Sequence, residues 1–342
     1  MGESYAAAGV SIESGEEAVR RIAPLARSTF GAEVLSGIGS FGSVVAVPAG
    51  YRQPLLVAST DGVGTKLQVA VATGRYETVG IDLVAMCVDD VAVQGADPLF
   101  FLDYIAVAQV EPSMVEALVA GMADGCRQAG CALVGGEVAE HGEGHPLDLA
   151  GFAVGVVERD SLITGRAVAA GDALVGLPSP GLRSNGYSLA RRVLIGADDA
   201  RLHQPAWGGA SHALADELLR PSIVYAPAMA ALRRVVPVHA FAHITGGGLP
   251  GNVPRVLPDG CLAVIDRSAW PEPQIFDEIR RQGDVADEEM ARVFNLGLGM
   301  VAVVPQPAVA AAQDVLAGFT GSYVVGRVVS RPGPPAVEFS QL

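Results

Sequence analysis

The chain has 342 residues, a length that favours two domains over a single small binding module. Half of the residues are hydrophobic and 18% are charged, which gives enough apolar material for a sizeable core and excludes disorder over most of the length. The formal net charge of -14 argues against a nucleic-acid partner, because a polyanion would meet a repulsive field.

The cysteines and the N-terminal segment indicate the compartment. The four cysteines, at 87, 126, 131 and 261, lack the paired CxxC spacing of a structural zinc site, so we expect buried free thiols in a reducing compartment. Residues 1–30 lack the basic start and apolar run of a secretory signal, and no stretch is apolar enough to span a bilayer. We therefore expect a soluble cytoplasmic protein that does not act at a membrane.

The pattern of hydrophobic residues predicts alternating strands and helices. Runs rich in β-branched residues predict strands, in chain order, at 43–47, 55–59, 100–107, 132–134, 149–157, 173–177, 262–265, 299–304 and 323–329. Periodic or apolar stretches predict helices at 14–27, 78–94, 112–129, 187–195, 223–235, 270–282, 287–294 and 308–316. Some strands follow one another after only a turn, which favours an α+β or mixed α/β fold over a purely parallel sheet. The polar stretch at 158–172 predicts a boundary between domains 1–165 and 166–342.

The first glycine-rich segment, SGIGSFG at 36–42, contains the spacing GxGxxG. A dinucleotide-binding fingerprint must follow a strand and open a helix, whereas a strand pattern that ends at Pro48 follows here. We therefore do not interpret the segment as a dinucleotide site. Two interpretations stay open: a flexible turn that enters a strand, or a loop whose backbone amides cover a phosphate.

A second candidate segment, STDGVGTKL at 59–67, follows an apolar strand. Its glycines allow a ligand to approach the backbone, Asp61 offers a hard oxygen ligand for a divalent cation, and Lys66 offers a point charge for phosphate. Lys66 is the only lysine beside 22 arginines, which indicates a role that arginine cannot fill. The alternative is a hairpin-like turn with solvated charges.

Several carboxylates lie in apolar surroundings. Asp82, Asp89 and Asp90 fall in a predicted apolar helix, where a buried carboxylate is costly unless it is paired, hydrogen-bonded or metal-bound. Glu137 ends the apolar stretch CALVGGE, where a helix cap or a salt bridge is the alternative to a ligand role. Asp61, Asp90 and Glu137 could together supply oxygen ligands for Mg²⁺ and leave positions open for phosphate.

The second half of the chain carries two further candidate segments. GLRSNGYSL at 181–189 is a turn that leads into a helix, so Ser184 and Asn185 could meet an anion at the helix start or simply cap the helix. In HITGGGLPGN, His243 and Thr245 come before three successive glycines. This pattern predicts a backbone nest for an anion with a titratable group beside it.

These segments together resemble one enzyme family, the aminoimidazole ribonucleotide synthetases, also called phosphoribosylformylglycinamidine cyclo-ligases. The likeness covers nearly the full chain and is carried, in order, by YAAAGVSIESG, STDGVGTKL, GIDLVAMCVDDVAVQGADPLFFLDY, GCALVGGEVAE, SNGYSLARR, HITGGGLPGNVPRVLP and FNLGLGM. The resemblance implies two α/β domains whose N-terminal sheets pair across a homodimer. It also implies that ATP and Mg²⁺ phosphorylate the formyl amide oxygen of formylglycinamidine ribonucleotide, after which an amidine nitrogen attacks and the imidazole ring closes with loss of phosphate.

The resemblance also implies roles for particular residues. Mg²⁺ would be held by Asp61, Asp90 and Glu137. ATP would contact Gly37, Gly39, Ser40, Phe41, Gly42, Asp61, Gly62, Lys66, Asp90 and Glu137. The substrate would face Arg183, Ser184, Asn185, His243, Thr245, Gly246 and Gly247. Catalysis would involve Lys66, Asp90 and His243.

The chain departs from the family pattern mostly where these ligands would bind. Arg183 stands where the family usually carries histidine before the SNG turn, so a permanent cation replaces a titratable group. The other departures are Ala6, Ala7, Ser11, Ala23, Asp89 and Val138. They leave two alternatives: a related enzyme that activates a different small-molecule amide in specialised metabolism, or a catalytically silent nucleotide-binding dimer.

Overall fold

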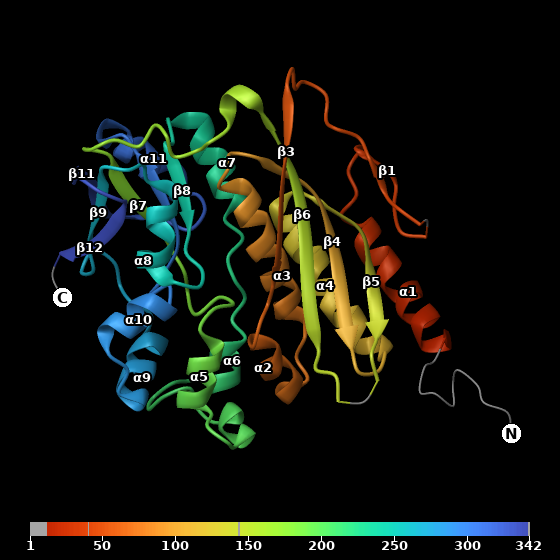
Figure 1. The fold of residues 1–342 in the computed structure, drawn as a ribbon. Helices are drawn as coiled ribbons and strands as arrows, with labels where there is room; N and C mark the ends of the chain where they lie inside the picture. The colour runs from red at the N-terminus through yellow and green to blue at the C-terminus, as the bar shows by residue number, and fades with distance from the viewer. Residues whose placement is uncertain (1–11, 40, 143, 341–342) are drawn as a thin grey trace, which may run out of the picture.

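The computed structural model describes residues 12–39, 41–142 and 144–340, which form two lobes, each built on one large β-sheet (Figure 1). The departures at Ala6, Ala7 and Ser11, and the predicted nucleotide contact Ser40, lie outside these residues. The predicted mixed α/β class is confirmed, because both sheets combine parallel and antiparallel pairs and helices pack on them. Within the described ranges, no helix is both long and apolar enough to cross a membrane.

The N-terminal lobe contains a four-stranded sheet in the order β3-β6-β4-β5. Its strands are β3 (Pro54–Gly62), β4 (Asp97–Val107), β5 (Ala132–Glu140) and β6 (Asp148–Glu158). The β4–β5 pair is parallel, and β6 is antiparallel to both β3 and β4. The short strands β1 (Val34–Ser36) and β2 (Val44–Val45) form a separate pair. The helices of this lobe are α1 (Ile12–Arg27), α2 (Lys66–Thr73), α3 (Glu77–Ala92) and α4 (Pro112–Ala129).

Among the described residues, no helix covers one face of this sheet (Figure 1). Helices α3 and α4 lie on the same side of the sheet, and α1 packs beside α4 and β5 (Figure 1). On the opposite face, Leu56, Tyr104 and Phe152 are 62%, 42% and 40% exposed. Apolar side chains gathered on an exposed sheet face are typical of a surface that another protein surface covers.

The C-terminal lobe contains a six-stranded sheet in the order β12-β9-β11-β7-β10-β8. Its strands are β7 (Ala173–Pro178), β8 (Ala240–His243), β9 (Cys261–Asp266), β10 (Leu298–Val304), β11 (Tyr323–Ser330) and β12 (Ala336–Ser340). Its helices are α5 (Tyr187–Leu194), α6 (Leu214–Leu218), α7 (Ala226–Val235), α8 (Gly248–Asn252), α9 (Gln274–Gly283), α10 (Asp287–Val293) and α11 (Val309–Leu316). Short 3₁₀ turns are η1 (Arg159–Ser161), η2 (Asp199–His203), η3 (Val253–Val256) and η4 (Gln306–Ala308).

Helix α3 lies between the two lobes. It is apolar around most of its circumference, a pattern typical of a buried helix. It packs on β3 and β6 of its own sheet and also contacts α7 of the other lobe. Because α3 is enclosed in this way, Asp82 and Asp89 are completely buried at the junction between the lobes.

Most of the predicted elements are confirmed, and the differences have physical causes. The elements that were not predicted are short, with too few residues to show a clear period: α2, α6, α8, β1, β8 and β12. The helix predicted from Trp270 begins instead at Gln274, since Pro271 and Pro273 disfavour a helical backbone at the residues that precede them. The four cysteines are buried and free, as predicted.

Candidate active site at the domain junction

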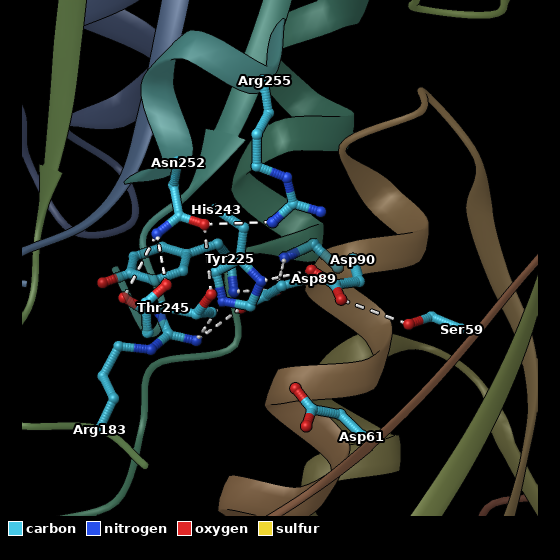
Figure 2. A network of polar contacts seen from close by, with 12 residues as sticks. Ser59, Asp61, Asp89, Asp90, Arg183, Tyr225, His243, Thr245, Asn252 and Arg255 are labelled. Atoms are coloured by element: carbon cyan, nitrogen blue, oxygen red, sulfur yellow. Dashed lines mark hydrogen bonds and ion pairs between the residues drawn. The ribbon is translucent and has the colours of Figure 1, made fainter. Parts of the chain in front are cut away.

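A chain of four polar side chains crosses the junction between the lobes (Figure 2). Asp89 and Asp90 lie near the end of α3, Arg183 lies in the turn before α5, and His243 ends β8. Arg183 Nη2 donates to Asp89 Oδ2 at 3.1 Å and lies 3.0 Å from His243 Nε2. His243 Nδ1 lies 2.7 Å from Asp90 Oδ1. Two residues from each lobe therefore form one continuous polar network.

Asp89 anchors this network in the interior. Its Oδ1 accepts hydrogen bonds from the backbone amides of Tyr225 and Ala226 at 2.8 and 3.0 Å. These amides begin α7, where helix N–H groups lack intrahelical partners and a carboxylate is favoured. Burial raises the pKa of Asp89, while Arg183 and His243 oppose that rise. Asp89, a departure from the family pattern, thus caps a helix of the other lobe and pairs with Arg183.

The network opens to solvent at Asp90, whose side chain is 41% exposed. Asp90 Oδ2 accepts a hydrogen bond from Ser59 at 3.3 Å, and Asp61 lies close by on the same strand as Ser59 (Figure 2). Burial raises the pKa of Asp61; the Gly62 amide opposes the rise and the charge of Asp90 adds to it. Burial also acts on Asp90, but hydrogen bonds from His243 and Ser59 outweigh it and lower the pKa of Asp90. An ionised carboxylate with a second one beside it suits a divalent cation.

The glycine-rich loop after β8 is held in a fixed shape. Asn252 Nδ2 donates to the carbonyls of Thr245, Gly246 and Gly248 at 3.3, 3.1 and 2.9 Å. Gly248 has a φ of +58, and a Cβ there would lie 1.9 Å from the Ala291 carbonyl oxygen, so no side chain fits. The loop is therefore a preformed backbone surface beside the polar network.

The SNG turn faces this loop. A Cβ on Gly246 would lie 3.4 Å from Asn185 Oδ1, so Asn185 lies against the loop. Ser184 Oγ is buried and has no hydrogen-bond partner within the described part of the chain. Buried polar groups normally have a partner, so a bound polar ligand would satisfy it. The structure thus brings together the residues predicted to face the substrate: Arg183, Ser184, Asn185, His243, Thr245, Gly246 and Gly247.

Lys66 lies in the interior, away from this opening. Its Nζ lies 2.5 Å from Asp82 Oδ2 and donates to the carbonyls of Arg183 and Arg220 at 3.1 and 2.8 Å. Burial lowers the pKa of Lys66, and Asp82 opposes that effect. Because three protein oxygens already surround the ammonium, a contact with phosphate would have to displace one of them. A compact ammonium suits these three oxygens better than a planar guanidinium does, which explains a lone lysine here.

Glu137 and the first glycine-rich loop meet at a different place. A cavity of about 830 Å³ beside β5 is lined by Gly39, Phe41, Gly42, Asp103 and Glu137, with apolar walls from α1 and β4. Burial raises the pKa of Asp103 to about 7. A backbone hydrogen bond lowers this pKa, and the negative charge of Glu137 raises it further. Gly37 does not line the cavity: a Cβ there would meet the Phe30 ring. The departure Val138 lines it, and Ala23 lies in α1.

The predicted metal ligands therefore lie in two places within one chain. Asp61 is on β3 and Glu137 is on β5, the two edge strands of the sheet. Asp61 and Gly136, the neighbour of Glu137, lie level with one another on opposite edges of the sheet, because Asp61 pairs with Gly151, Gly151 with Asp103 and Asp103 with Gly136. Three strand spacings, about 14 Å, therefore separate Asp61 from Gly136. Among the residues that the structure describes, no group of three or more His, Cys, Asp or Glu could hold a metal ion. Asp61 and Asp90 come together, and Glu137 lies apart from them.

Four residues of the site were not predicted individually: Ser59, Tyr225, Asn252 and Arg255. Ser59, Asn252 and Arg255 belong to segments that were identified as motifs from the sequence. The motifs therefore indicated these regions, but they did not indicate which contacts the three side chains make. Arg255 Nη1 donates to Asn252 Oδ1 at 3.2 Å and its charge helps to lower the pKa of Asp90. Tyr225 belongs to no motif; the Arg183 guanidinium stacks 4.8 Å from the centre of its ring.

The two sheets and the polar junction between them define an AIR synthase-related protein. The family model "AIR synthase related protein, N-terminal domain" matches residues 43–157, and the model of the C-terminal domain matches residues 169–336. A solved thiamine-monophosphate kinase from Stenotrophomonas maltophilia K279a has a TM-score of 0.66 at 20% identity, covering 94% of this chain and 96% of that one. The hydrogenase maturation protein HypE in complex with ATP has a TM-score of 0.65 at 18% identity, covering 94% and 91%. At these identities the likeness shows the fold alone.

Relatives in sequence are much more similar. A phosphoribosylformylglycinamidine cyclo-ligase of Myxococcus xanthus strain DK1622 is 52% identical over 340 residues, covering 97% of this chain and 98% of the relative. Another, of Symbiobacterium thermophilum, is 52% identical over 349 residues, covering 98% of each. The chain belongs to the phosphoribosylformylglycinamidine cyclo-ligase family.

Proposed function

We propose that this chain is an ATP-dependent cyclo-ligase. It phosphorylates the formyl amide oxygen of formylglycinamidine ribonucleotide and closes the imidazole ring, which gives aminoimidazole ribonucleotide, ADP and phosphate. One observation carries the proposal: four segments that are far apart in the sequence meet at the domain junction, namely 59–61, 89–90, 183–185 and 243–247. The chain also has relatives about 50% identical that are named phosphoribosylformylglycinamidine cyclo-ligase. We propose that it acts in the cytoplasm on this small molecule.

Asp61 and Asp90 are the ligands that we propose for Mg²⁺. They fit the ion because they are neighbouring oxygen donors that reach solvent, and the pKa of Asp90 is lowered. When bound, Mg²⁺ neutralises charge on the phosphoryl group that ATP transfers. Ser59 and His243, through their hydrogen bonds to Asp90, hold that carboxylate in one orientation.

The substrate seat lies between the SNG turn and the glycine-rich loop. Ser184 Oγ would donate to a phosphate or hydroxyl oxygen of the ribonucleotide, which gives this buried hydroxyl the partner it lacks among the described residues. The amides of Gly246 and Gly247 would approach an anion closely, because no side chain shields them. Holding the formyl amide and the amidine nitrogen in one fixed seat removes most of the entropic cost of ring closure.

The cavity beside β5 is where we propose that the nucleotide base enters. Its volume of about 830 Å³ and its mostly apolar walls fit a small planar ligand. The loop with Gly39, Phe41 and Gly42 borders the cavity, and its backbone amides would cover phosphate. Glu137 lies on the same rim, where its carboxylate would reach the Mg²⁺-bound phosphates.

A homodimer would join the cavity and the junction. The exposed apolar face with Leu56, Tyr104 and Phe152 is the surface that we propose for pairing. A twofold axis parallel to the strands would set β5 of one copy beside β3 of the other. Glu137 of the partner subunit would then approach Asp61, and the three proposed metal ligands would meet across the interface.

The activity is tested by mixing the purified protein with ATP, Mg²⁺ and formylglycinamidine ribonucleotide. We expect ADP and aminoimidazole ribonucleotide to appear in equal amounts. Tight ATP binding without turnover would contradict the proposal. ADP release with a different amide only would identify a related enzyme with another substrate.

The shared site is tested by mixing two variants that are each expected to be inactive, Asp61→Asn and Glu137→Gln. If subunits share sites, half of the dimers are mixed and each has one intact site, so about a quarter of wild-type activity returns after subunit exchange. Mixtures that stay inactive while the subunits exchange would place both residues in the same subunit's site.

A further inference from the structure

Arg183 is held in an unusual backbone conformation. Its φ of +62 lies in the left-handed region, which side chains other than glycine, asparagine, aspartate and histidine seldom adopt. Lys66 Nζ donates to the Arg183 carbonyl at 3.1 Å, and Arg183 is only 2% exposed. Strained residues of this kind persist only where their surroundings fix them. The position of the guanidinium is therefore built into the junction.

Gly299 leaves the space that the Arg183 guanidinium occupies. A Cβ on Gly299 would lie 2.6 Å from Arg183 Nη1 and 2.2 Å from the Tyr225 hydroxyl oxygen. Any side chain at position 299 would therefore push the guanidinium away from its place over the Tyr225 ring. Glycine at 299 and arginine at 183 fit one another.

The guanidinium decides which nitrogen of His243 carries the hydrogen. Arginine has donors and no acceptor, so the 3.0 Å contact from Arg183 Nη2 requires an unprotonated His243 Nε2 that accepts. The hydrogen of the neutral ring is then on Nδ1, which lies 2.7 Å from Asp90 Oδ1 and donates to it.

We propose that Arg183 is a positioning residue: it holds His243 as the Nδ1–H tautomer, and His243 in turn fixes the direction of the Asp90 carboxylate. His243 is only 6% exposed and both of its nitrogens have partners within the protein. It therefore orients Asp90 and does not exchange a proton with the substrate. This inference deepens the proposed function and rests on it, since Asp90 is the proposed Mg²⁺ ligand.

The first test uses the unaltered full-length protein labelled with ¹⁵N-histidine. Two-bond ¹H–¹⁵N correlation spectra near neutral pH distinguish the tautomers, and the His243 signals are those lost in His243→Asn. We expect a protonated Nδ1 and an unprotonated Nε2, whereas a hydrogen on Nε2 would overturn the inference. No substrate is needed. Absent turnover with the expected tautomer would therefore count against the proposed function and not against the tautomer.

The second test removes the donor. Because Arg183→Met alone would leave Asp89 buried and unpaired, the variant combines Asp89→Asn with Arg183→Met. We expect mixed His243 tautomers and a fall in kcat of about tenfold or more with little change in the KM for substrate, since Asp90 loses its orientation but the seat remains. Arg183→Lys, which keeps a charged donor, should retain the Nδ1–H tautomer and recover part of kcat.

Arg267→Met is the matched control for this variant. Arg267 is also a mostly buried arginine that stacks on an aromatic ring, 5.5 Å from the centre of Phe339, and pairs with Glu272 at 2.9 Å. We expect its loss to change stability and leave the His243 signals unaltered. A single Nδ1–H tautomer that survives in Asp89→Asn/Arg183→Met would overturn the role of Arg183. A His243 spectrum that changes equally in Arg267→Met would overturn it too.

Discussion

The domain junction and the cavity beside β5 place their carboxylates in opposite surroundings. At the junction, buried Asp82 lies against Lys66 and buried Asp89 against Arg183, each with additional backbone donors. In the cavity, Asp103 has mostly apolar neighbours, and burial raises its pKa to about 7. Cationic partners and backbone donors therefore favour the ionised carboxylates at the junction, whereas the cavity carboxyl has no cationic partner among the described residues to oppose the effect of burial.

This difference matches the two tasks in the proposed reaction. A carboxylate that binds Mg²⁺ has to stay ionised and point in one direction, and the network from Asp89 to Asp90 provides both. A pocket for the uncharged base of a nucleotide gains more from apolar walls than from fixed charges. Variants in one region should therefore affect different properties from variants in the other.

The largest expected effect comes from breaking the junction at Lys66. Lys66→Ala would leave the Asp82 carboxylate buried without its counter-charge, so we expect the free energy of unfolding to fall by about 3–5 kcal/mol in chemical denaturation. The control Lys66→Met/Asp82→Asn removes both charges and should recover much of that loss. Unchanged stability in Lys66→Ala together with lost ATP binding would instead place Lys66 on the nucleotide.

A smaller effect is expected in the cavity, from the proton on Asp103. The folded-state pKa of Asp103, about 7, lies above its unfolded value, so protonated Asp103 is favoured in the folded protein. This contribution to stability is complete at low pH and is lost as the pH rises through 7. The change is at most about 1.4 kcal/mol for each pH unit between about pH 4 and pH 7. Asp103→Asn cannot titrate, so its stability relative to wild type should rise between pH 5 and pH 8 in urea denaturation. Parallel pH dependences of the two proteins would contradict the raised pKa.

The smallest effect on stability is expected at Phe41, which is fully exposed at the rim of the cavity. Phe41→Ala should change the free energy of unfolding by less than about 0.5 kcal/mol, because it removes little buried surface. It should raise the KM for ATP by a few fold at unchanged kcat, since it removes a contact made equally in the ground state and the transition state. Phe319→Ala, at a half-exposed phenylalanine of the other lobe, is the control. Equal KM values in both variants would exclude Phe41 from the nucleotide site.

Much of the fold could be predicted from the sequence because its long elements carry clear periods. The helix at 112–129 and the strands at 149–157 and 323–329 show apolar patterns that tertiary contacts did not override. The residues of the polar network were singled out by motif, and the structure brings Asp90, Arg183 and His243 together.

Contacts that depend on strand order and on the second lobe could not be predicted. Nothing in the sequence of β3 and β5 shows that β6 and β4 lie between them, so the separation of Asp61 from Glu137 within one chain could not be predicted. The composition marked Lys66 as exceptional, but its partners include two backbone carbonyls from the other lobe, which no side-chain pattern indicates.

The most direct test of the junction as the catalytic centre is the turnover of Asp90→Asn with formylglycinamidine ribonucleotide, ATP and Mg²⁺, compared with wild type at matched stability. We expect kcat to fall by about tenfold or more, a loss of about 1.4 kcal/mol or more of transition-state stabilisation. A kcat close to that of wild type in folded Asp90→Asn would contradict the placement of the reaction at the domain junction.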